Sequence, residues 1–431
     1  MFVIYSFMYF LIFASALPFY LLFRRLKGKP PIKVLSRLGF KLPPIKAASG
    51  RPIWIHSVSV GEVMAARPLI LQIKKDYPDL PVLMSVTTET GWNTAGSIYN
   101  DDIQLIHFPL DFSFSVRRYL RAIKPRLVVI METELWPRFC LEIKKHSIPL
   151  ILVNGRLSET SFPKYRRMKF LIGRVLRCFS ILIVQTAFYR DRFIQLGADP
   201  AVIRIASSLK YHISNFDLDM KKKNDFIRKL RTGKNDPLIT GGSTHEGEED
   251  TLISVYKRLM KDHPEAKLII APRHPERFAE VEDLIIRSEL PYFKLSDTKS
   301  YGIWRVMLVD RMGELKNCYS ISRAVFVGGS LIPHGGQNLL EAAAFAVPVI
   351  FGPHIYNFLE TADMLLDSGG GFMVRDESDL FKTLAFLLDN PIESETAGRA
   401  ARSVIDNNQD GLEIVMSEIS KFLKQDQNGS S

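Results

Sequence analysis

Short apolar runs alternate with longer amphipathic stretches through the first half of the chain. The runs are rich in Val, Ile and Leu, which is typical of strands that are buried on both faces of a sheet. Amphipathic spacing over residues 67–77 and 115–123 predicts helices between these strands. The alternation is typical of βαβ units and therefore predicts a parallel sheet. The expected strands are residues 52–56, 82–87, 104–108, 127–131, 150–153 and 181–185.

A polar, charged segment at residues 207–236 interrupts this pattern, and we interpret it as a linker with a short helix. The alternation then resumes, so the sequence predicts an α/β fold class with two doubly wound domains and a cleft between them. The second set of expected strands is residues 238–241, 268–271, 306–309, 324–327 and 349–351. The expected helices are residues 248–262, 338–345, 378–388 and 411–423, followed by a frayed tail.

The first 23 residues carry no charge and are followed directly by Arg24 and Arg25. This stretch is long enough to span a bilayer. Its positive charges follow the apolar run, whereas those of a cleavable signal peptide precede it. The pattern predicts an uncleaved membrane anchor, with the rest of the chain on the cytoplasmic side. It also permits a helix in the membrane interface, or a helix buried in the fold, because Pro18 interrupts the run.

The net charge of +11 is concentrated near the N-terminus. Nine basic residues precede the first acidic residue, Glu62, so the remaining chain carries only +2. This distribution argues against a protein that coats nucleic acid, and it indicates a basic arm attracted to anionic lipid headgroups. The cysteines Cys140, Cys178 and Cys318 lie far apart in sequence, which excludes a disulfide scaffold.

Several common motifs are absent from the sequence. Neither domain has G-x-G-x-x-G after its first strand, and no P-loop or H-E-x-x-H occurs, which argues against nicotinamide, ATPase and zinc-protease chemistry. Asp217 and Asp219 have the spacing of a metal-binding D-x-D, but their place in the charged linker favours two solvated side chains. The sequence therefore predicts no metal site.

Two acidic segments follow strands of the first domain. Glu62 ends a strand–turn segment and opens a helix, so it is either a general base at the ligand edge or a partner of the helix dipole. Glu132 and Glu134 precede Trp136 after another strand. Together they suit the binding of sugar hydroxyls; alternatively, Trp136 anchors the loop and both acids are solvated.

A basic amphipathic stretch follows in the same domain. It suits contact with a membrane or an anionic headgroup, or it is a solvated face over an ordinary core stripe. Its basic residues are Lys164, Arg166, Arg167, Lys169, Arg174 and Arg177, and its apolar stripe is Met168, Leu171, Ile172, Val175, Leu176 and Phe179.

The second domain carries three candidate anion sites. Ser243 and Glu246 have the spacing of a capping box, and the small residues around them also suit a phosphate. A basic cluster follows the next strand and suits a phosphate or carboxylate; it consists of Arg273, His274 and Arg277. Two glycines precede the helix expected at 338–345, where Asn338 and Glu341 share a face. The two glycines, Asn338 and Glu341 together indicate a nucleotide–sugar site, with a phosphate at the helix N-terminus and Glu341 directed to a ribose.

Seven segments, in chain order, resemble those of the 3-deoxy-D-manno-octulosonic acid (Kdo) transferases: SVSVGE, ETELWP, NGRLS, GGSTHEGEE, PRHPERF, MGEL and GGSLIPHGGQNLLEAAAFAVPVIFGPH. The resemblance implies the GT-B fold, in which two Rossmann-like domains face each other across a cleft, and attachment to the cytoplasmic face of the inner membrane. The implied parts are an anchor at 1–23, a basic arm at 24–47, an acceptor domain at 48–206, a linker at 207–236, a donor domain at 237–424 and a tail at 425–431.

The resemblance also implies the reaction, its partners and its residues. Kdo would pass with inversion from CMP-Kdo to the 6′-hydroxyl of the tetraacylated, bis-phosphorylated lipid A precursor (lipid IVA), at the inner membrane and without a cofactor. Glu62 matches the family's general base, and Glu132 and Lys210 match positions that stabilise the transition state. The segments that match CMP-binding positions contain Pro272, Arg273, Met312, Gly313, Glu314, Asn338, Leu339, Leu340 and Glu341. Ser243, Gly335 and Gly336 are candidate phosphate contacts, and Lys164, Arg166, Arg167 and Lys169 form a candidate acceptor or membrane surface.

Two alternatives remain. Another GT-B member, such as a UDP-sugar transferase or 2-epimerase, would share the glycine-rich segment but not ETELWP together with PRHPERF. A membrane-tethered lipid-binding module would need no carboxylate base. No residue indicates how many Kdo units are added.

Overall fold

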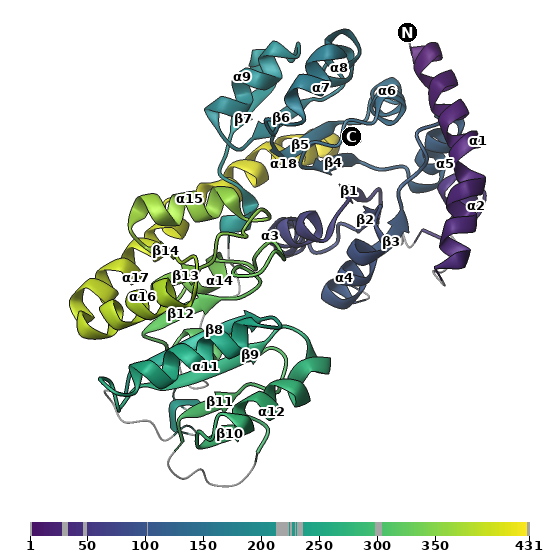
Figure 1. Cartoon of the computed structure of the whole chain (residues 1–431). Coiled ribbons are helices and arrows are strands. Elements are labelled where there is room, and N and C mark those ends of the chain that lie inside the picture. Colours follow the sequence, from purple (N-terminus) through teal and green to yellow (C-terminus); the bar gives the residue numbers. More distant parts are fainter. Residues whose placement is uncertain are drawn as a thin grey trace. The chain divides into compact units, whose positions relative to one another are not determined.

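The computed structural model describes residues 2–27, 33–45, 50–100, 102–212, 224, 226–228, 230, 236–297 and 304–428. The chain divides into two compact units (Figure 1). The first consists of Met1–His212 with Gln409–Ser431, and the second of Ile213–Asn408. Each unit contains a parallel sheet with helices around it, which confirms the expected α/β class with two Rossmann-like domains.

Seven parallel strands form one sheet in the described part of the first unit, in the order β3-β2-β1-β4-β5-β6-β7. Six of them match the expected strands to within two residues. The strand that was missed, β7, is a three-residue edge strand without a continuous apolar run. The bounds are β1 Ile53–Ser57, β2 Val82–Val86, β3 Gln104–His107, β4 Leu127–Met131, β5 Leu150–Gly155, β6 Ile181–Val184 and β7 Ile203–Ile205.

Helices pack on both faces of this sheet, so the buried strand residues alternate between two cores. One core includes residues of α3, α4 and α18, and the other includes residues of α5, α6, α8 and α9. The helices are α1 Phe2–Leu26, α2 Val34–Arg37, α3 Val60–Asp76, α4 Glu89–Tyr99, α5 Ser113–Ile123, α6 Pro137–Lys145, α7 Phe162–Arg167, α8 Lys169–Leu176 and α9 Ala187–Gln195, with 3₁₀ turns η1 Pro200–Val202 and η2 Leu209–Tyr211.

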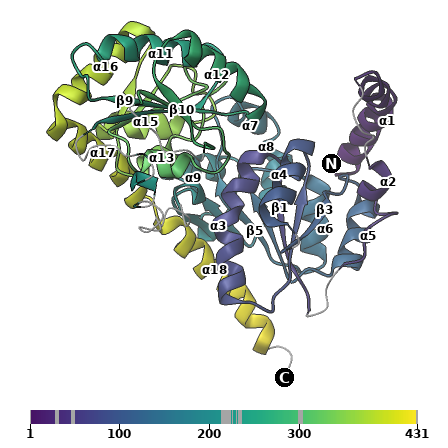
Figure 2. The same ribbon diagram turned by 90° about the horizontal axis from the view of Figure 1, so that it is seen from below.

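The last helix, α18 (Asp410–Asn428), returns to the first unit. This corrects the assignment of residues 409–424 to the donor domain. Helix α18 also includes residues 425–428, which were expected in a frayed tail, and residues 429–431 lie outside the described residues. Figure 2 shows α18 in yellow beside α3. Its core residues are Leu412, Val415, Met416, Ile419 and Leu423. An amphipathic stripe shows that a helix covers a core, but not which core, so the sequence pattern left this return undetected.

The N-terminal helix α1 is continuous through Pro18, and its length and composition are sufficient to cross a membrane. None of its residues is buried, so the interpretation as a buried helix is wrong. Figure 1 shows α1 in purple along the first unit, and both of its ends contact that unit. Arg138 Nη2 donates to the Phe2 carbonyl at 2.6 Å, and Arg24 pairs with Glu89 at 2.9 Å.

The sheet of the second unit also has seven parallel strands among the described residues, in the order β10-β11-β9-β8-β12-β13-β14. Five were expected, and the other two, β10 and β14, are three-residue edge strands. The strands are β8 Leu238–Thr244, β9 Lys267–Pro272, β10 Tyr292–Lys294, β11 Val306–Leu308, β12 Ala324–Val327, β13 Val349–Phe351 and β14 Gly371–Met373. The helices are α11 Glu248–Leu259, α12 Phe278–Arg287, α13 Leu315–Tyr319, α14 Leu340–Ala343, α15 Leu359–Ser368, α16 Glu377–Asp389 and α17 Pro391–Asp406, with the 3₁₀ turn η3 Pro275–Arg277.

The expected linker at residues 207–236 begins inside the first unit, because η2 belongs to it. Most of the remaining linker lies outside the described residues, and this includes Asp217 and Asp219.

Candidate active site

Glu62 lies in the first turn of α3, after the carboxyl end of β1. Ser59 caps this helix: its hydroxyl accepts from the Glu62 N–H at 3.4 Å and donates to Glu62 Oε1 at 3.1 Å. The Val58 N–H donates to Glu62 Oε2 at 2.7 Å. These reciprocal bonds fix the carboxyl group at the edge where open α/β sheets bind their ligands.

The Glu62 side chain is almost enclosed, since the residue is only 5% exposed. Burial raises the pKa of Glu62 to about 7; the Val58 N–H opposes this shift, and the nearby charges of Glu132 and Glu134 add to it. A carboxyl group with such a pKa exchanges protons with substrate near neutral pH. A group that served only the helix dipole would need to stay ionised, so the raised pKa favours the general-base interpretation.

Glu132 joins two cations at the same edge of the sheet. It follows β4 with a φ of +54°, in the left-handed region. Lys210 Nζ lies 3.2 Å from Glu132 Oε1, and Arg156 Nη2 lies 2.8 Å from Oε2. Arg156 follows β5, and Lys210 lies in η2, so segments from three parts of the chain converge here. The Asn154 side chain holds η2 by accepting from the Leu209 N–H at 3.0 Å.

The sequence named Glu132 and Lys210 as separate candidates, and the structure brings them into direct contact. It missed Arg156, although this residue is the arginine of the NGRLS segment. The Glu132 side chain is 12% exposed. Burial raises the pKa of Glu134 to about 7, and the Glu132 charge contributes. The alternative in which both acids are solvated is therefore wrong.

The loop after β8 in the second unit is organised by Glu248, not by the expected capping box. That expectation is wrong, because Ser243 belongs to β8 and Gly247 caps α11 without a side chain. Glu248 is 1% exposed and accepts four backbone N–H bonds, which tie the loop after β8 to the loop after β12. The donors are His245 (3.0 Å), Gly329 (2.7 Å), Ser330 (3.0 Å) and Leu331 (3.0 Å).

A histidine cluster lies beside these loops. The His245 ring centroid is 4.0 Å from that of His334 and 5.4 Å from that of His274, and the Gln337 amide lies 3.2 Å from His245 Nε2. Burial lowers the pKa of His245 to about 4, and the neighbouring histidines contribute, so this ring is neutral at pH 7. Sequence reasoning missed His245, His334 and Gln337 as candidates, although all three stand within segments that carried the resemblance. Among the described residues, no group of three His, Cys, Asp or Glu side chains could hold a metal ion.

The basic cluster after β9 is divided between two roles. Arg277 binds Glu249 at 2.7 Å and Glu280 at 3.0 Å, so its expected role in anion binding is corrected to a structural one. Arg273 is exposed, and its backbone N–H is fixed by the Thr244 carbonyl at 3.0 Å. It is therefore the candidate anion contact of this segment.

The helix expected at residues 338–345 is shorter, since α14 contains only Leu340–Ala343. Asn338 caps the chain by accepting from the Leu340 N–H at 3.2 Å, and it donates to Glu341 at 3.3 Å. The N–H of Leu340 is therefore already bonded, and a phosphate site at this end of the helix stays a prediction. Burial raises the pKa of Glu341, while Asn338 and the charges of Lys316 and Arg273 lower it, so Arg273 lies near this carboxyl group.

Not every residue of the expected donor segments has an accessible side chain. Leu339 and Leu340 are core residues, and Pro272, Gly335 and Gly336 are buried. Met312 is 57% exposed, and Gly313 has a φ of +87°. Glu314 accepts from the Asn317 amide at 2.7 Å. The polar side chains left to contact a donor are those of Arg273, Glu314, Asn338 and Glu341.

The basic stretch of the first unit forms two short helices, α7 and α8, instead of one. Met168, expected in the core stripe, is 50% exposed between them because the helices break there. Phe170 is 68% exposed, and Arg174 lies over its ring at 4.5 Å. Lys164, Arg166, Arg167 and Lys169 are all exposed, so the surface combines cations with apolar side chains.

Comparison with known proteins shows the family of the chain. The family description "3-Deoxy-D-manno-octulosonic-acid transferase (kdotransferase)" matches residues 33–213. The chain is 34% identical to the 3-deoxy-D-manno-octulosonic acid transferase of Haemophilus influenzae over 375 residues, which cover 86% of this chain and 87% of that protein. It is 31% identical to the enzyme of the same name from Chlamydophila psittaci over 397 residues, which cover 90% of each chain.

A solved structure shares the fold alone. UDP-GlcNAc 2-epimerase from Neisseria meningitidis, bound to UDP-GlcNAc, is 14% identical, with a TM-score of 0.58 over 86% of this chain and 100% of that one. The sequence relatives, which match over most of their length, decide the family. This chain belongs to the 3-deoxy-D-manno-octulosonic acid transferase family of glycosyltransferases.

Proposed function

We propose that this chain transfers Kdo from CMP-Kdo to the 6′-hydroxyl of the tetraacylated, bis-phosphorylated lipid A precursor in lipopolysaccharide biosynthesis. Glu62 removes the proton of the acceptor hydroxyl, whose oxygen forms a bond to C2 of Kdo with inversion. The bond from C2 to the phosphate oxygen breaks, and its electron pair leaves with CMP. The observation that carries the proposal is the buried Glu62 carboxyl group, which the Val58 N–H and the Ser59 hydroxyl fix just after the carboxyl end of β1.

Charge on the first unit supports this chemistry. The transition state has oxocarbenium character, and the carboxylate of Glu132 is a group that stabilises such a charge. Lys210 and Arg156 hold that carboxylate from two sides at 3.2 and 2.8 Å. Lys210 is also a cation suited to the departing phosphate. Because these three side chains hold one another in place, they need little rearrangement as the transition state forms.

On the second unit we propose a CMP site built from Arg273, Glu314, Asn338 and Glu341. The Arg273 guanidinium suits the phosphate, and the Asn338–Glu341 pair offers a donor and an acceptor to the nucleoside. The neutral His245 ring, held by Gln337, is an additional polar contact for this site.

The proposed acceptor is a membrane lipid, so the proposal also places the protein at the membrane. Helix α1, the basic arm after it and the exposed surface from Lys164 to Arg174 would attach the chain to the cytoplasmic face of the inner membrane. Cations near anionic headgroups contribute about 1 kcal/mol each, and exposed Met168 and Phe170 suit the interface.

The test is a product-mass assay with full-length protein in detergent, CMP-Kdo and the tetraacyl precursor. Wild-type protein should add whole Kdo units to the lipid. Glu62→Gln should slow the reaction by about 10²–10⁴-fold, and Lys210→Met by about 10²–10³-fold. The control Glu413→Gln removes an exposed carboxylate of the first unit and should keep full activity. A folded Glu62→Gln variant with wild-type turnover would refute the assignment of the base.

A further inference from the structure

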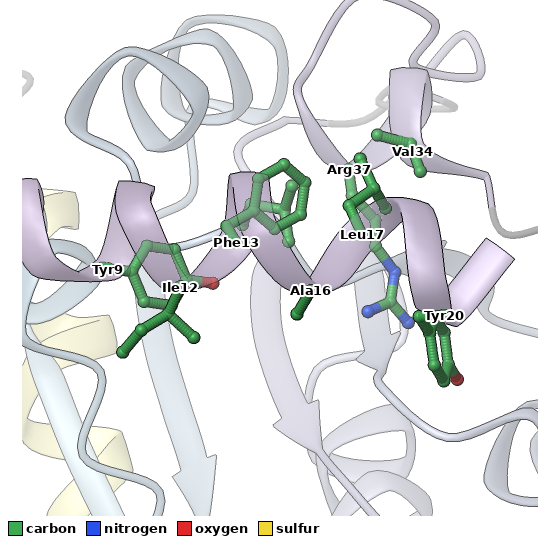
Figure 3. Close-up of a pocket in the computed structure, with 9 residues that line it drawn as sticks. Tyr9, Ile12, Phe13, Ala16, Leu17, Tyr20, Val34 and Arg37 are labelled. Atoms are coloured by element: carbon green, nitrogen blue, oxygen red, sulfur yellow. The ribbon is translucent and has the colours of Figure 1, made fainter.

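A cavity of about 290 Å³ lies where α1 meets the body of the first unit. At roughly 30 Å³ per water it has the volume of about ten waters, which is room for a segment of one alkyl chain rather than a whole lipid. Its wall is mostly apolar, and Figure 3 shows side chains of α1 and α2 around it. The wall includes Phe13, Ala16, Leu17, Tyr20, Val34 and Leu110, together with Arg37.

Arg37 supplies one positive charge to this wall. Its guanidinium Nη2 donates to the Thr87 carbonyl at 2.5 Å, and Figure 3 shows the group close to Tyr20. In the part of the chain that the structure describes, no carboxylate pairs with Arg37. Burial lowers the pKa of Arg37, which reflects the cost of removing this charge from water. An anion from outside the chain would offset that cost.

Hydrogen bonds to the backbone just after β1 and β2 bring the wall of the cavity close to Glu62 along the chain. Arg37 binds the carbonyl of Thr87, and the hydroxyl of Thr88 donates to the Val58 carbonyl at 2.8 Å. The Val58 N–H in turn binds Glu62 at 2.7 Å. Arg37 and Glu62 therefore contact the same carboxyl-terminal edge of β1 and β2, where ligands of open α/β sheets bind.

We propose that this cavity binds part of one acyl chain of the phosphorylated lipid acceptor, with Arg37 beside a phosphate of the same molecule. The inference rests on the proposed function, because it takes the acceptor to be an acylated, phosphorylated disaccharide. The guanidinium in the apolar wall calls for an anion beside an alkyl chain, which an acylated phosphate-bearing lipid supplies. The position of the wall at the edge that carries Glu62 selects the acceptor over a bulk phospholipid. In this arrangement α1 is part of the acceptor site as well as an anchor.

The first test fills the cavity. Ala16 and Ala14 are both exposed on α1, but only Ala16 lines the cavity. Ala16→Trp should raise the KM for the lipid acceptor about tenfold and leave the KM for CMP-Kdo unchanged. Ala14→Trp adds the same apolar bulk and should change neither value. Equal acceptor KM values for the two variants would overturn the proposal.

The second test addresses the charge. Arg37→Gln retains a donor for the Thr87 carbonyl and should raise the KM for the bis-phosphorylated acceptor but not for its dephosphorylated analogue. Arg25→Gln removes an exposed positive charge near the end of α1 and should affect both lipids equally. An Arg37→Gln variant that does not discriminate between the two lipids would contradict the role of Arg37.

The third test does not depend on turnover. All three native cysteines are buried, so maleimide should react with a cysteine introduced into α1. The tetraacyl precursor should protect Ala16→Cys from labelling but not Ala14→Cys, and phosphatidylglycerol in the same detergent should protect neither. Equal protection of Ala16→Cys by phosphatidylglycerol would assign the cavity to bulk phospholipid and overturn the proposal.

These outcomes separate the two proposals. If the protein transfers no Kdo but the precursor still protects Ala16→Cys, the proposed function fails and the acceptor cavity stands. If Kdo transfer is normal and the precursor gives no selective protection, the cavity proposal fails and the function stands.

Discussion

At the scale of single residues, Glu62 shows a conflict between stability and chemistry. Burial raises its pKa from 4.5 to about 7, so the folded state binds a proton that the unfolded chain has already released between those values. Stability contributed by the protonated group is therefore fully present below about pH 4.5 and is lost as the pH rises through about 7. The ionised form that accepts a proton from substrate is also the form that destabilises the fold.

Glu62→Gln should therefore be more stable than the wild type at pH 8, by about 3 kcal/mol from the size of the pKa shift. The two proteins should be equally stable near pH 4.5, because Gln resembles the protonated carboxyl group. Urea unfolding at both pH values measures this difference. A variant that is less stable than the wild type at pH 8 would show that the Glu62 charge is compensated in the folded state.

Glu132 provides a second prediction, on the pH dependence of the rate. Its charge raises the pKa of Glu62, so kcat/KM in Glu132→Asn should rise with pH at lower values than in the wild type, whose rise is expected near pH 7. Asn tolerates the left-handed φ of +54°, so the backbone is preserved. Glu280→Gln, in the second unit, should leave the profile unchanged. A Glu132→Asn profile that coincides with that of the wild type would exclude coupling between the two acids.

At the scale of elements, α1 is held along its length by specific contacts. Tyr5 donates to buried Asp111 at 2.8 Å, and Asp111 also accepts the N–H groups of Arg138 and Phe139 at the start of α6. Arg24 binds Glu89 near the other end of α1. A 25-residue helix is about 37 Å long. Both ends of α1 contact the first unit. This favours a helix that lies in the membrane interface over a helix that crosses the bilayer.

This arrangement predicts how the two ends of α1 react with thiol reagents. Val3→Cys and Leu26→Cys should both be inaccessible to a membrane-impermeant maleimide added outside intact cells, and both should react in inverted vesicles. Labelling of Val3→Cys from outside would show instead that α1 spans the membrane. The three native cysteines are buried and should contribute no background signal.

At the scale of the whole molecule, the chain enters the second unit after residue 212 and returns to the first at residue 409. The core of the first unit that includes residues of α3, α4 and α18 is therefore assembled from two distant parts of the sequence. Ile419 of α18 is fully buried in it with Ile70 and Ile73 of α3. The first unit thus depends on a helix that follows the whole second unit in the sequence.

Ile419→Ala should lower the free energy of unfolding of the first unit by about 2–5 kcal/mol, because it leaves a cavity in the core. The exposed residue Ile392 gives a control, and Ile392→Ala should change stability by less than about 0.5 kcal/mol. Tryptophan fluorescence reports on this unit, which holds Trp54, Trp92 and Trp136, while Trp304 lies in the second unit. An unchanged transition in Ile419→Ala would show that α18 is dispensable.

The sequence predicted those parts of the fold in which local pattern and burial coincide. Interior strands have continuous apolar runs, whereas the missed strands β7, β10 and β14 are at sheet edges, where a side chain of each faces solvent or is half-buried. The position of Glu62 in the first turn of a helix could be predicted because a strand and a turn precede it and an amphipathic stretch follows. Capping-box spacing was used in the second domain. That spacing misled at Ser243 and Glu246, because Glu248 accepts the hydrogen bonds of the backbone N–H groups there. The contact of Lys210 with Glu132 depends on tertiary packing, so the sequence around either residue does not indicate it.

The return of α18 has a consequence for synthesis of the protein. Residues 213–408 are contiguous, so the second unit can fold as soon as they leave the ribosome. The first unit, although most of it is translated earlier, stays incomplete until residues 409–431 emerge, and until then the apolar face of α3 is uncovered. A chain truncated before residue 409 would combine a finished second unit with an exposed apolar surface on the first, which makes it a substrate for proteolysis. Only chains that include α18 would then accumulate as folded protein.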